Sequence, residues 1–170
     1  ELTQVLVQAG ATIPFGVSNS VIYDENNEWV VSYTGMTVNA ESTTAPFYGD
    51  TCMEVTNIGR MDSISFTNTT AVSYADYTTI GFAIKLKEKM TSQMGLYMSF
   101  YSDGVLVSNE VQVTVDKANV TTWQTVQLAM SDFTFSSPSF KQVRLRWSKT
   151  GANTNHAGFY LDYMKLQDGV

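Results

Sequence analysis

The sequence has 170 residues, enough for one domain with a hydrophobic core. It holds 10 Lys and Arg against 16 Asp and Glu, and this formal charge of −6 argues against nucleic-acid binding, which needs clustered cations. Aromatic residues make up 12% of the chain, and 21 Thr and 16 Ser accompany them, which excludes a disordered chain and favours strands. No apolar run approaches the ~20 residues that a membrane-spanning helix requires.

Apolar and polar residues alternate along most of the chain, which is the period-two pattern of β-strands. In chain order, the pattern predicts strands around residues 5–7, 29–33, 53–55, 63–66, 82–86, 96–100, 111–115, 126–130, 143–147 and 159–163. Gly, Asn and Asp residues between these segments mark turns. About ten short strands at this spacing predict an all-β fold, either an antiparallel β-sandwich or a barrel. No repeat or linker divides the chain, so we expect a single domain over residues 1–170.

Residues 1–20 are less regular, and we expect either an extra strand or a connection to a preceding domain. Glu1 opens the sequence with no basic region and no apolar stretch, so we expect a mature product or a domain cut from a larger chain. Cys52 is the only cysteine, which excludes an intramolecular disulfide and leaves the role of a small buried hydrophobe. His156 is the only histidine and lies in a polar run, so we expect a solvated or sugar-contacting loop residue instead of a catalytic base.

One face of the central strands carries unusual side chains. Tyr97 and Tyr101 alternate with apolar residues in one segment, and Arg144 and Arg146 do so in another. A plain solvent face would favour Lys, Glu and Thr at these positions. The C–H face of a sugar packs on an aromatic plane, and sugar hydroxyls hydrogen-bond to forked donors. If these strands share a sheet, its outer face therefore suits a sugar.

Four segments resemble the jelly-roll carbohydrate-binding modules, most closely those of family 11, with relatives in families 4, 22 and 30. They are residues 21–35, with an acidic opening strand, residues 47–55, with a glycine turn, residues 122–133, with a W-x-x-V-x-L strand, and residues 143–166, with an Asp in the final strand. Together they cover about residues 21–167. The resemblance implies a jelly-roll β-sandwich that binds a polysaccharide, with a β-glucan as the expected ligand, across a concave sheet.

The resemblance also implies a set of ligand-binding side chains. Tyr33 and Trp147 match stacking aromatics of the family, although strict alternation turns the Trp147 ring inward, and core packing is the competing interpretation for both. For the two arginines the competing interpretation is a surface salt bridge, and Trp123 is expected to be structural. Asp103 matches the edge of the groove, but an ordinary hairpin turn is the preferred interpretation. The candidate ligand-binding residues are Tyr33, Tyr97, Tyr101, Arg144, Arg146 and Trp147.

Modules of this kind commonly hold a structural calcium ion away from the groove. Calcium takes six to eight oxygen ligands, often from carboxylates and backbone carbonyls. The resemblance implies Asp24, Glu25, Asp50 and Asp162 as candidate ligands. Asp162 is the strongest, because a carboxylate in the middle of an apolar strand is costly unless a metal, an Arg or the backbone satisfies it.

Three functions remain open. The first is an extracellular, non-catalytic module that is covalently linked to catalytic or anchoring domains and binds a polysaccharide; the paired arginines suit neutral and acidic glycans alike. The second is a structural or adhesion domain of a larger assembly, such as a phage tail or a cell-surface protein. The third is a polysaccharide lyase or glycosidase, which is disfavoured because glycoside hydrolysis needs two placed carboxylates and the groove strands offer no such pair. Neither nucleic acid nor membrane is expected as a partner.

Overall fold

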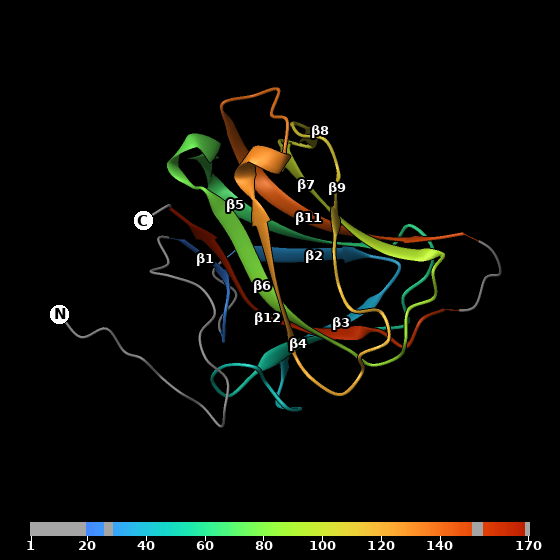
Figure 1. Ribbon diagram of the computed structural model, residues 1–170. Coiled ribbons are helices and arrows are strands. Elements are labelled where there is room, and N and C mark those ends of the chain that lie inside the picture. Colours follow the sequence, from blue (N-terminus) through green and yellow to red (C-terminus); the bar gives the residue numbers. More distant parts are fainter. Residues whose placement is uncertain (1–19, 26–28, 151–154, 169–170) are drawn as a thin grey trace.

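The computed structural model describes residues 20–25, 29–150 and 155–168, which form two antiparallel sheets packed face to face (Figure 1). The strands are β1 (Ser20–Tyr23), β2 (Val30–Thr34), β3 (Thr37–Ser42), β4 (Cys52–Thr56), β5 (Ser63–Ser73), β6 (Thr79–Leu86), β7 (Met94–Ser102), β8 (Val105–Leu106), β9 (Val111–Val113), β10 (Gln124–Ala129), β11 (Ser139–Lys149) and β12 (Phe159–Gln167). Two short 3₁₀ helices, η1 (Tyr74–Asp76) and η2 (Met130–Asp132), follow β5 and β10. The predicted all-β sandwich is confirmed.

Each sheet is a row of five paired strands, with a sixth strand attached beside the row. The β6 sheet has the order β10-β6-β12-β4-β3, with β1 also paired to β12. The β11 sheet has the order β2-β5-β11-β7-β8, with β9 also paired to β7. Strands distant in sequence therefore lie side by side, as β5, β11 and β7 do.

The described residues form more strands than the sequence pattern predicted. β3 was missed because its inward positions hold Val38, Ala40 and Ser42, which is too little apolar character for a clear period-two signal. β8 has two residues and belongs to a tight hairpin. The strand predicted around residues 5–7, and nearly all of the predicted 1–20 segment, lie outside the described residues.

The core between the sheets is built from the alternating apolar residues. Phe82, Ile84 and Leu86 of β6 are at most 1% exposed, and β7 contributes Leu96 and Met98 from the facing sheet. Complete burial of a side chain of this size contributes about 1.5–3 kcal/mol to folding. The pattern that predicted the strands is therefore also the main source of their stability.

The hairpin between β7 and β8 settles the role of Asp103. Asp103 and Gly104 both have positive φ, at 50° and 82°, and Ser102 pairs with Val105 across them. Two consecutive residues with positive φ form the type I′ turn that matches the twist of a hairpin. Asp103 is a turn residue, as preferred, and its carboxylate pairs with Lys141 at 2.9 Å.

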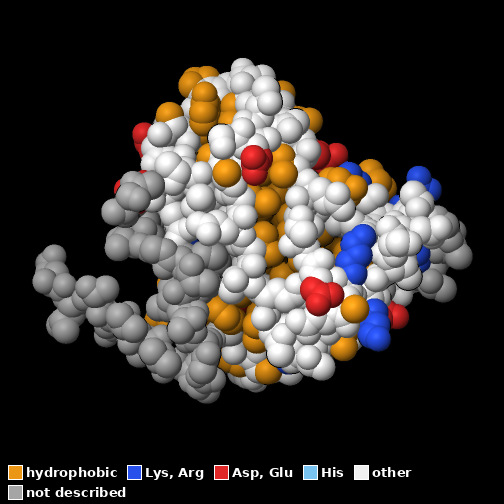
Figure 2. Space-filling view, in the orientation of Figure 1, with side chains coloured by type: hydrophobic (Ala, Val, Ile, Leu, Met, Phe, Trp, Pro, Cys, Tyr) orange, Lys and Arg blue, Asp and Glu red, His pale blue; other side chains and the backbone are white. Residues whose placement is uncertain are grey.

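One face of the molecule shows hydrophobic side chains at its surface (Figure 2). In the view of Figure 2, hydrophobic side chains form a strip down the middle of the molecule, and charged side chains are scattered around it. Among the described residues, neither helix has the length and hydrophobicity that crossing a membrane demands.

Candidate functional site

The outer face of the β11 sheet brings four of the predicted side chains together. Residues directly opposite each other on antiparallel strands share a face. Arg144 pairs with Ser65 of β5 on one side and Ser99 of β7 on the other, and Arg146 pairs with Tyr97. The outward positions of the three central strands are Ser63, Ser65, Thr67, Tyr97, Ser99, Tyr101, Gln142, Arg144 and Arg146.

Arg144 lies at the centre of this face, over an aromatic ring. Its guanidinium carbon is 3.9 Å from the ring centroid of Tyr101. Its Nε donates to Ser65 Oγ at 3.2 Å, and its Nη2 donates to Gln142 Oε1 at 3.5 Å. Cation–π contact and hydrogen bonds to neutral groups hold the side chain in place. No carboxylate lies within 4.0 Å of it in the described part of the chain.

Arg146 has the same aromatic contact but also an acidic partner. Its guanidinium carbon lies 4.9 Å from the ring centroid of Tyr97. Its Nε and Nη2 donate to the two carboxylate oxygens of Glu110 at 2.7 and 3.1 Å, a bidentate pair. The competing interpretation of a surface salt bridge therefore holds for Arg146 and not for Arg144.

Two of the predicted ligand-binding residues do not reach this face. The Trp147 side chain is 1% exposed in the core, with its ring centroid 6.2 Å from that of Phe159, so its prediction as a stacking residue is wrong. Alternation along β11 turns the ring inward. Tyr33 is 51% exposed but pairs with buried Ile64, so at the edge strand β2 it lies on the opposite face from Arg144.

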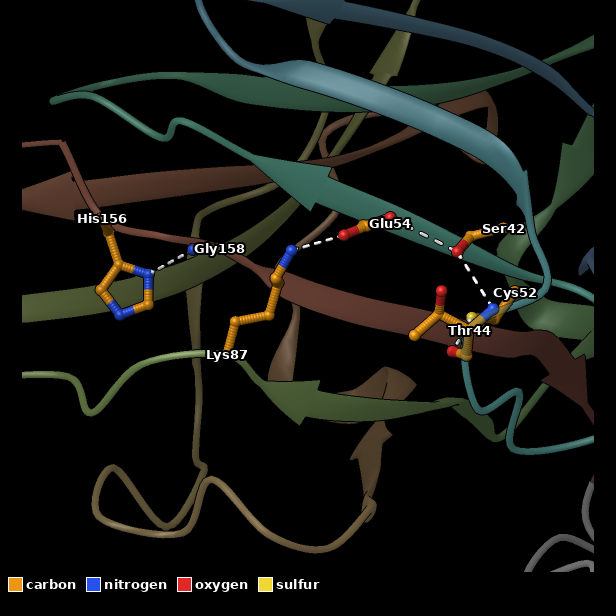
Figure 3. Close-up of polar contacts among 7 residues, drawn as sticks. All are labelled: Ser42, Thr44, Cys52, Glu54, Lys87, His156 and Gly158. Carbon is orange, nitrogen blue, oxygen red and sulfur yellow. Dashed lines mark hydrogen bonds and ion pairs between the residues drawn. The ribbon is translucent and has the colours of Figure 1, made fainter.

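His156 belongs to the core, which corrects its prediction as a loop residue. It is 1% exposed, and its ring centroid lies 4.8 Å from that of Trp147. Its Nδ1 accepts a hydrogen bond from the Gly158 amide at 3.0 Å (Figure 3), and its Nε2 lies 3.0 Å from the Glu88 carbonyl oxygen. Burial lowers the pKa of His156. The neutral ring thus has a structural role, and it lies away from solvent.

Cys52 is fully buried, as expected, and its thiol donates to the Thr44 carbonyl at 3.6 Å (Figure 3). Burial raises the pKa of this thiol to about 12. A thiol that stays protonated is a poor nucleophile and a poor metal ligand. Cys52 therefore adds packing and no chemistry.

The outer face of the β6 sheet also carries charges and rings, and several of them are paired or covered. Lys87 forms an ion pair with Glu54, which accepts a hydrogen bond from Ser42 (Figure 3). Phe47 from the loop before β4 packs on this face in a small second hydrophobic cluster that includes Trp123. Trp123 Nε1 donates to the Ala45 carbonyl at 3.1 Å, so the structural role expected for this ring is confirmed.

Asp162 lies under the same loop and is fully buried. Its Oδ2 accepts hydrogen bonds from the amides of Phe47 and Tyr48 at 2.9 and 3.0 Å, and its Oδ1 has no hydrogen-bond partner. Burial raises the pKa of Asp162 to about 7 against these hydrogen bonds, and the negative charge of Asp24 adds to the rise. An acceptor with an unmet lone pair beside a second carboxylate is suited to a cation.

The other two predicted metal ligands are directed elsewhere. Glu25 Oε1 accepts a hydrogen bond from the Asp50 amide, so these two residues meet through the backbone of one and the carboxylate of the other. No group of three or more His, Cys, Asp and Glu side chains in the described residues is placed to hold a metal ion. The four predicted carboxylates therefore do not form one ligand set.

A hollow of about 320 Å³ lies at the end of the sandwich, beside η1 and η2. Tyr74, Tyr77, Met130 and Phe133 are among its lining residues, and no Asp, Glu, Lys, Arg or His contributes. The Tyr74 ring stacks flat on Phe135 with centroids 4.3 Å apart. This stack is packing within the protein.

No protein-family model matches the sequence, and a search of curated proteins found no match. Among solved structures, a family 11 carbohydrate-binding module from Clostridium thermocellum, in complex with a β-1,3-1,4-mixed-linked tetrasaccharide, aligns with a TM-score of 0.60 and 15% identity over 92% of this chain and 99% of that one. The CBM22-1 xylan-binding domain from Paenibacillus barcinonensis aligns at 0.56 and 14% identity over 92% and 100%. The glycoside hydrolase domain of Endo-D from Streptococcus pneumoniae aligns at 0.59 and 15% identity over 83% of this chain and 22% of that one. The resemblance to jelly-roll carbohydrate-binding modules is confirmed at the level of the fold.

Proposed function

We propose that the outer face of the β11 sheet binds a polysaccharide chain without reacting with it. The observation that carries the proposal is the row formed by Arg144, Tyr101, Arg146 and Tyr97, in which rings and forked donors stand side by side. Sugar rings stack on aromatic planes, and their hydroxyls accept hydrogen bonds from guanidinium groups. The shared fold of two modules named for oligosaccharide or xylan binding supports the proposal.

The distribution of exposed hydrophobic side chains also favours this face. The described residues include five large hydrophobic side chains that are exposed, and the strand register places two of them, Val30 and Leu106, on this face. Val30 is 65% exposed, and Leu106 is 45% exposed opposite Tyr101. These two exposed side chains add apolar surface to the face that carries Tyr97 and Tyr101, as is typical of an interaction site.

The scarcity of carboxylates on this face favours binding without catalysis. Glycoside hydrolysis needs an acid and a second carboxylate about 5–10 Å apart across the scissile bond. Among the described residues, the outward positions of β5, β11 and β7 hold no Asp or Glu, and the nearby Glu110 is engaged with Arg146. In this proposal the chain is an extracellular module attached to a catalytic or anchoring domain, to which it supplies contact with the polymer.

A calcium ion beside Asp162 is part of the proposal. Asp162 and Asp24 would supply carboxylate oxygens, and backbone carbonyls would complete the shell that calcium requires. The buried Oδ1 of Asp162, which no hydrogen bond satisfies, supports this position. The ion would neutralise two adjacent carboxylates and fix the loop that carries Phe47 and Tyr48. If so, excess EDTA lowers the melting temperature by several degrees and added Ca²⁺ restores it, whereas an unchanged melt removes the calcium from the account.

Affinity electrophoresis against β-glucan, xylan, mannan and uronate polymers tests the proposed function. The parent protein is expected to be retarded by at least one polymer, and Tyr101→Ala is expected to be retarded much less at the same polymer concentration. Tyr160→Ala is the matched control, because Tyr160 lies on the outer face of the other sheet, under Lys87. Retardation that both variants retain would contradict the assignment of this face, and no retardation of the parent by any polymer would favour the structural or adhesion alternative.

A further inference from the structure

The outer face of the β11 sheet has the opposite charge to the rest of the molecule. The whole chain carries −6, yet the outward positions of β5, β11 and β7 include two arginines and no carboxylate. Ser32 and Thr34 of β2 and Gln112 of β9 extend the same face with neutral side chains. Local positive potential on an acidic protein attracts an anion to that place.

Arg146 shows how an arginine on this face is neutralised. Its guanidinium lies over the Tyr97 ring and donates hydrogen bonds to both carboxylate oxygens of Glu110, at 2.7 and 3.1 Å. Arg144 lies two residues earlier on the same strand and stacks on Tyr101 in the same manner, at 3.9 Å. The carboxylate is the one part of the arrangement that Arg144 lacks in the described residues.

Arg144 retains donors for such a carboxylate. A guanidinium group has five N–H donors in a planar fork. Arg144 donates to two neutral oxygens, Ser65 Oγ and Gln142 Oε1, which leaves donors available on the terminal nitrogens. An anion in this position would form hydrogen bonds in which both partners are ionised, and it would add an attraction between opposite charges that a neutral hydroxyl lacks.

Ser99 provides a second, independent observation. It pairs directly with Arg144 across the β7–β11 ladder and therefore lies on the same face. Its side chain is 1% exposed, and its Oγ has no hydrogen-bond partner. A buried hydroxyl without a partner is rare in a folded protein and has a free-energy cost that a bound group can remove.

We propose that the polysaccharide bound here is a uronate-containing polymer, and that a sugar carboxylate pairs with Arg144 as Glu110 pairs with Arg146. This inference rests on the proposed function and specifies its ligand class. Tyr101 supplies the stacking plane beside the anion, and the Ser99 hydroxyl supplies a further donor at the base of the site. A neutral polymer would stack on the same rings but would leave the Arg144 charge without a counter-ion.

Two polymers with the same backbone test this inference. Mixed-linkage β-glucan is neutral, and oxidation of its C6 hydroxyls converts part of its glucose units to glucuronate. Isothermal titration calorimetry with each polymer at low salt is expected to show at least tenfold tighter binding of the oxidised one. Because the preference is electrostatic, we expect it to shrink severalfold in 0.5 M NaCl. Polygalacturonate serves as an acidic polymer with a different backbone.

Variants on one strand assign the effect to Arg144. Arg144→Gln is expected to remove the preference for the oxidised polymer, and Arg144→Lys to retain part of it, because lysine keeps the charge and loses the fork. Lys141→Gln is the matched control, since Lys141 lies on β11 but is already paired with Asp103. Unchanged melting temperatures establish that the variants are folded.

The outcomes separate this inference from the proposed function. Equal or weaker binding of the oxidised polymer, with neutral β-glucan binding weakened in Tyr101→Ala, would overturn the acidic ligand and leave polysaccharide binding in place. A preference that Arg144→Gln retains would also overturn the inference. Failure of all three polymers to bind would contradict both proposals.

Discussion

Both sheets turn aromatic and charged side chains outward, but their environments differ. On the β6 sheet, Lys87 is paired with Glu54, and Phe47 from the loop before β4 packs over the strands with Trp123, which precedes β10. On the β11 sheet, Arg144 lies on Tyr101 with no carboxylate partner among the described residues. The side-chain types on a face therefore do not identify a binding site; cover and pairing distinguish a stabilising face from a ligand-binding one.

The comparison assigns the two faces different energetic roles. Covered rings and satisfied carboxylates contribute to the free energy of unfolding, as buried groups do elsewhere. Half-exposed rings and a guanidinium without an acidic partner contribute little to folding and are available to a ligand. Substitutions on the β6 sheet should therefore alter stability, and those on the β11 sheet should alter binding.

The largest effect is expected from Asp162→Ala. The substitution leaves the amides of Phe47 and Tyr48 without their acceptor, and a buried donor left without a hydrogen bond costs about 1–3 kcal/mol. We expect the free energy of unfolding in urea to fall by about 3–5 kcal/mol. Glu110→Gln is the control on the other sheet, with a change below about 1 kcal/mol. Similar urea midpoints for the two variants would contradict the assigned roles.

The raised pKa of Asp162 should make the free energy of unfolding depend on pH when metal is removed. Burial raises the pKa of Asp162 from its ordinary 3.8 to about 7, so the folded chain holds a proton that the unfolded chain releases between these values. The free energy of unfolding in EDTA should therefore fall as pH rises from about 4 to 7. The expected fall is roughly 2–4 kcal/mol, because a tenfold difference in proton affinity between the folded and unfolded chain corresponds to about 1.4 kcal/mol.

Asp162→Asn isolates this contribution. The burial of His156 lowers its pKa and acts in the opposite sense, reducing stability as pH falls below about 6.5. The difference between the parent and Asp162→Asn cancels that effect. Parallel pH profiles for the two proteins in EDTA would show that Asp162 does not titrate in this range.

Trp123→Ala tests the cover of the β6 sheet. The ring contacts Phe47 at a centroid distance of 5.6 Å and donates to the Ala45 carbonyl. Since Trp123 is half-buried, we expect a loss of about 2 kcal/mol, less than the 3–5 kcal/mol of a fully buried tryptophan. Polysaccharide binding at a temperature where the variant is folded should stay within twofold of the parent. If Trp123→Ala weakened polysaccharide binding without lowering the free energy of unfolding, the β6 sheet, and not the β11 sheet, would carry the binding face.

The smallest of the predicted free-energy changes is the loss of binding in Tyr101→Ala, and it tests one side chain of the proposed site. Tyr101→Ala should weaken polysaccharide binding about tenfold, or about 1.4 kcal/mol, through loss of the stacking plane. Tyr33→Ala is the matched control, because Tyr33 is half-exposed in the same sheet but its register places it opposite Ile64. Titration calorimetry measures both variants, and equal losses would show that the register does not separate these two tyrosines.

The alternation of apolar and polar residues along the strands was enough to predict much of the fold and the face of several side chains. It placed Tyr97, Tyr101, Arg144 and Arg146 on one face, because each faces away from buried neighbours on a long, regular strand. The same rule turned Trp147 inward, where the structure has it, so the match to a stacking aromatic of the family was the weaker guide at that position.

Contacts between distant segments could not be predicted in this way. Glu110 comes from a loop 36 residues before Arg146, and no local pattern indicates that the two pair. His156 lies in a polar run, yet its backbone pairs with Ile58 and draws the ring into the core. The face of Tyr33 depends on the register of an edge strand, which the local sequence specifies weakly.

Backbone amide NMR of the folded domain, titrated with oligosaccharides from the polymer that binds best, tests the central claim most directly. The account predicts chemical-shift changes along β5, β7 and β11, centred on Ser99, Tyr101 and Arg144, with the β6 sheet nearly unchanged. Changes centred on β6, β10 and β12, or shifts spread evenly over both sheets, would contradict it.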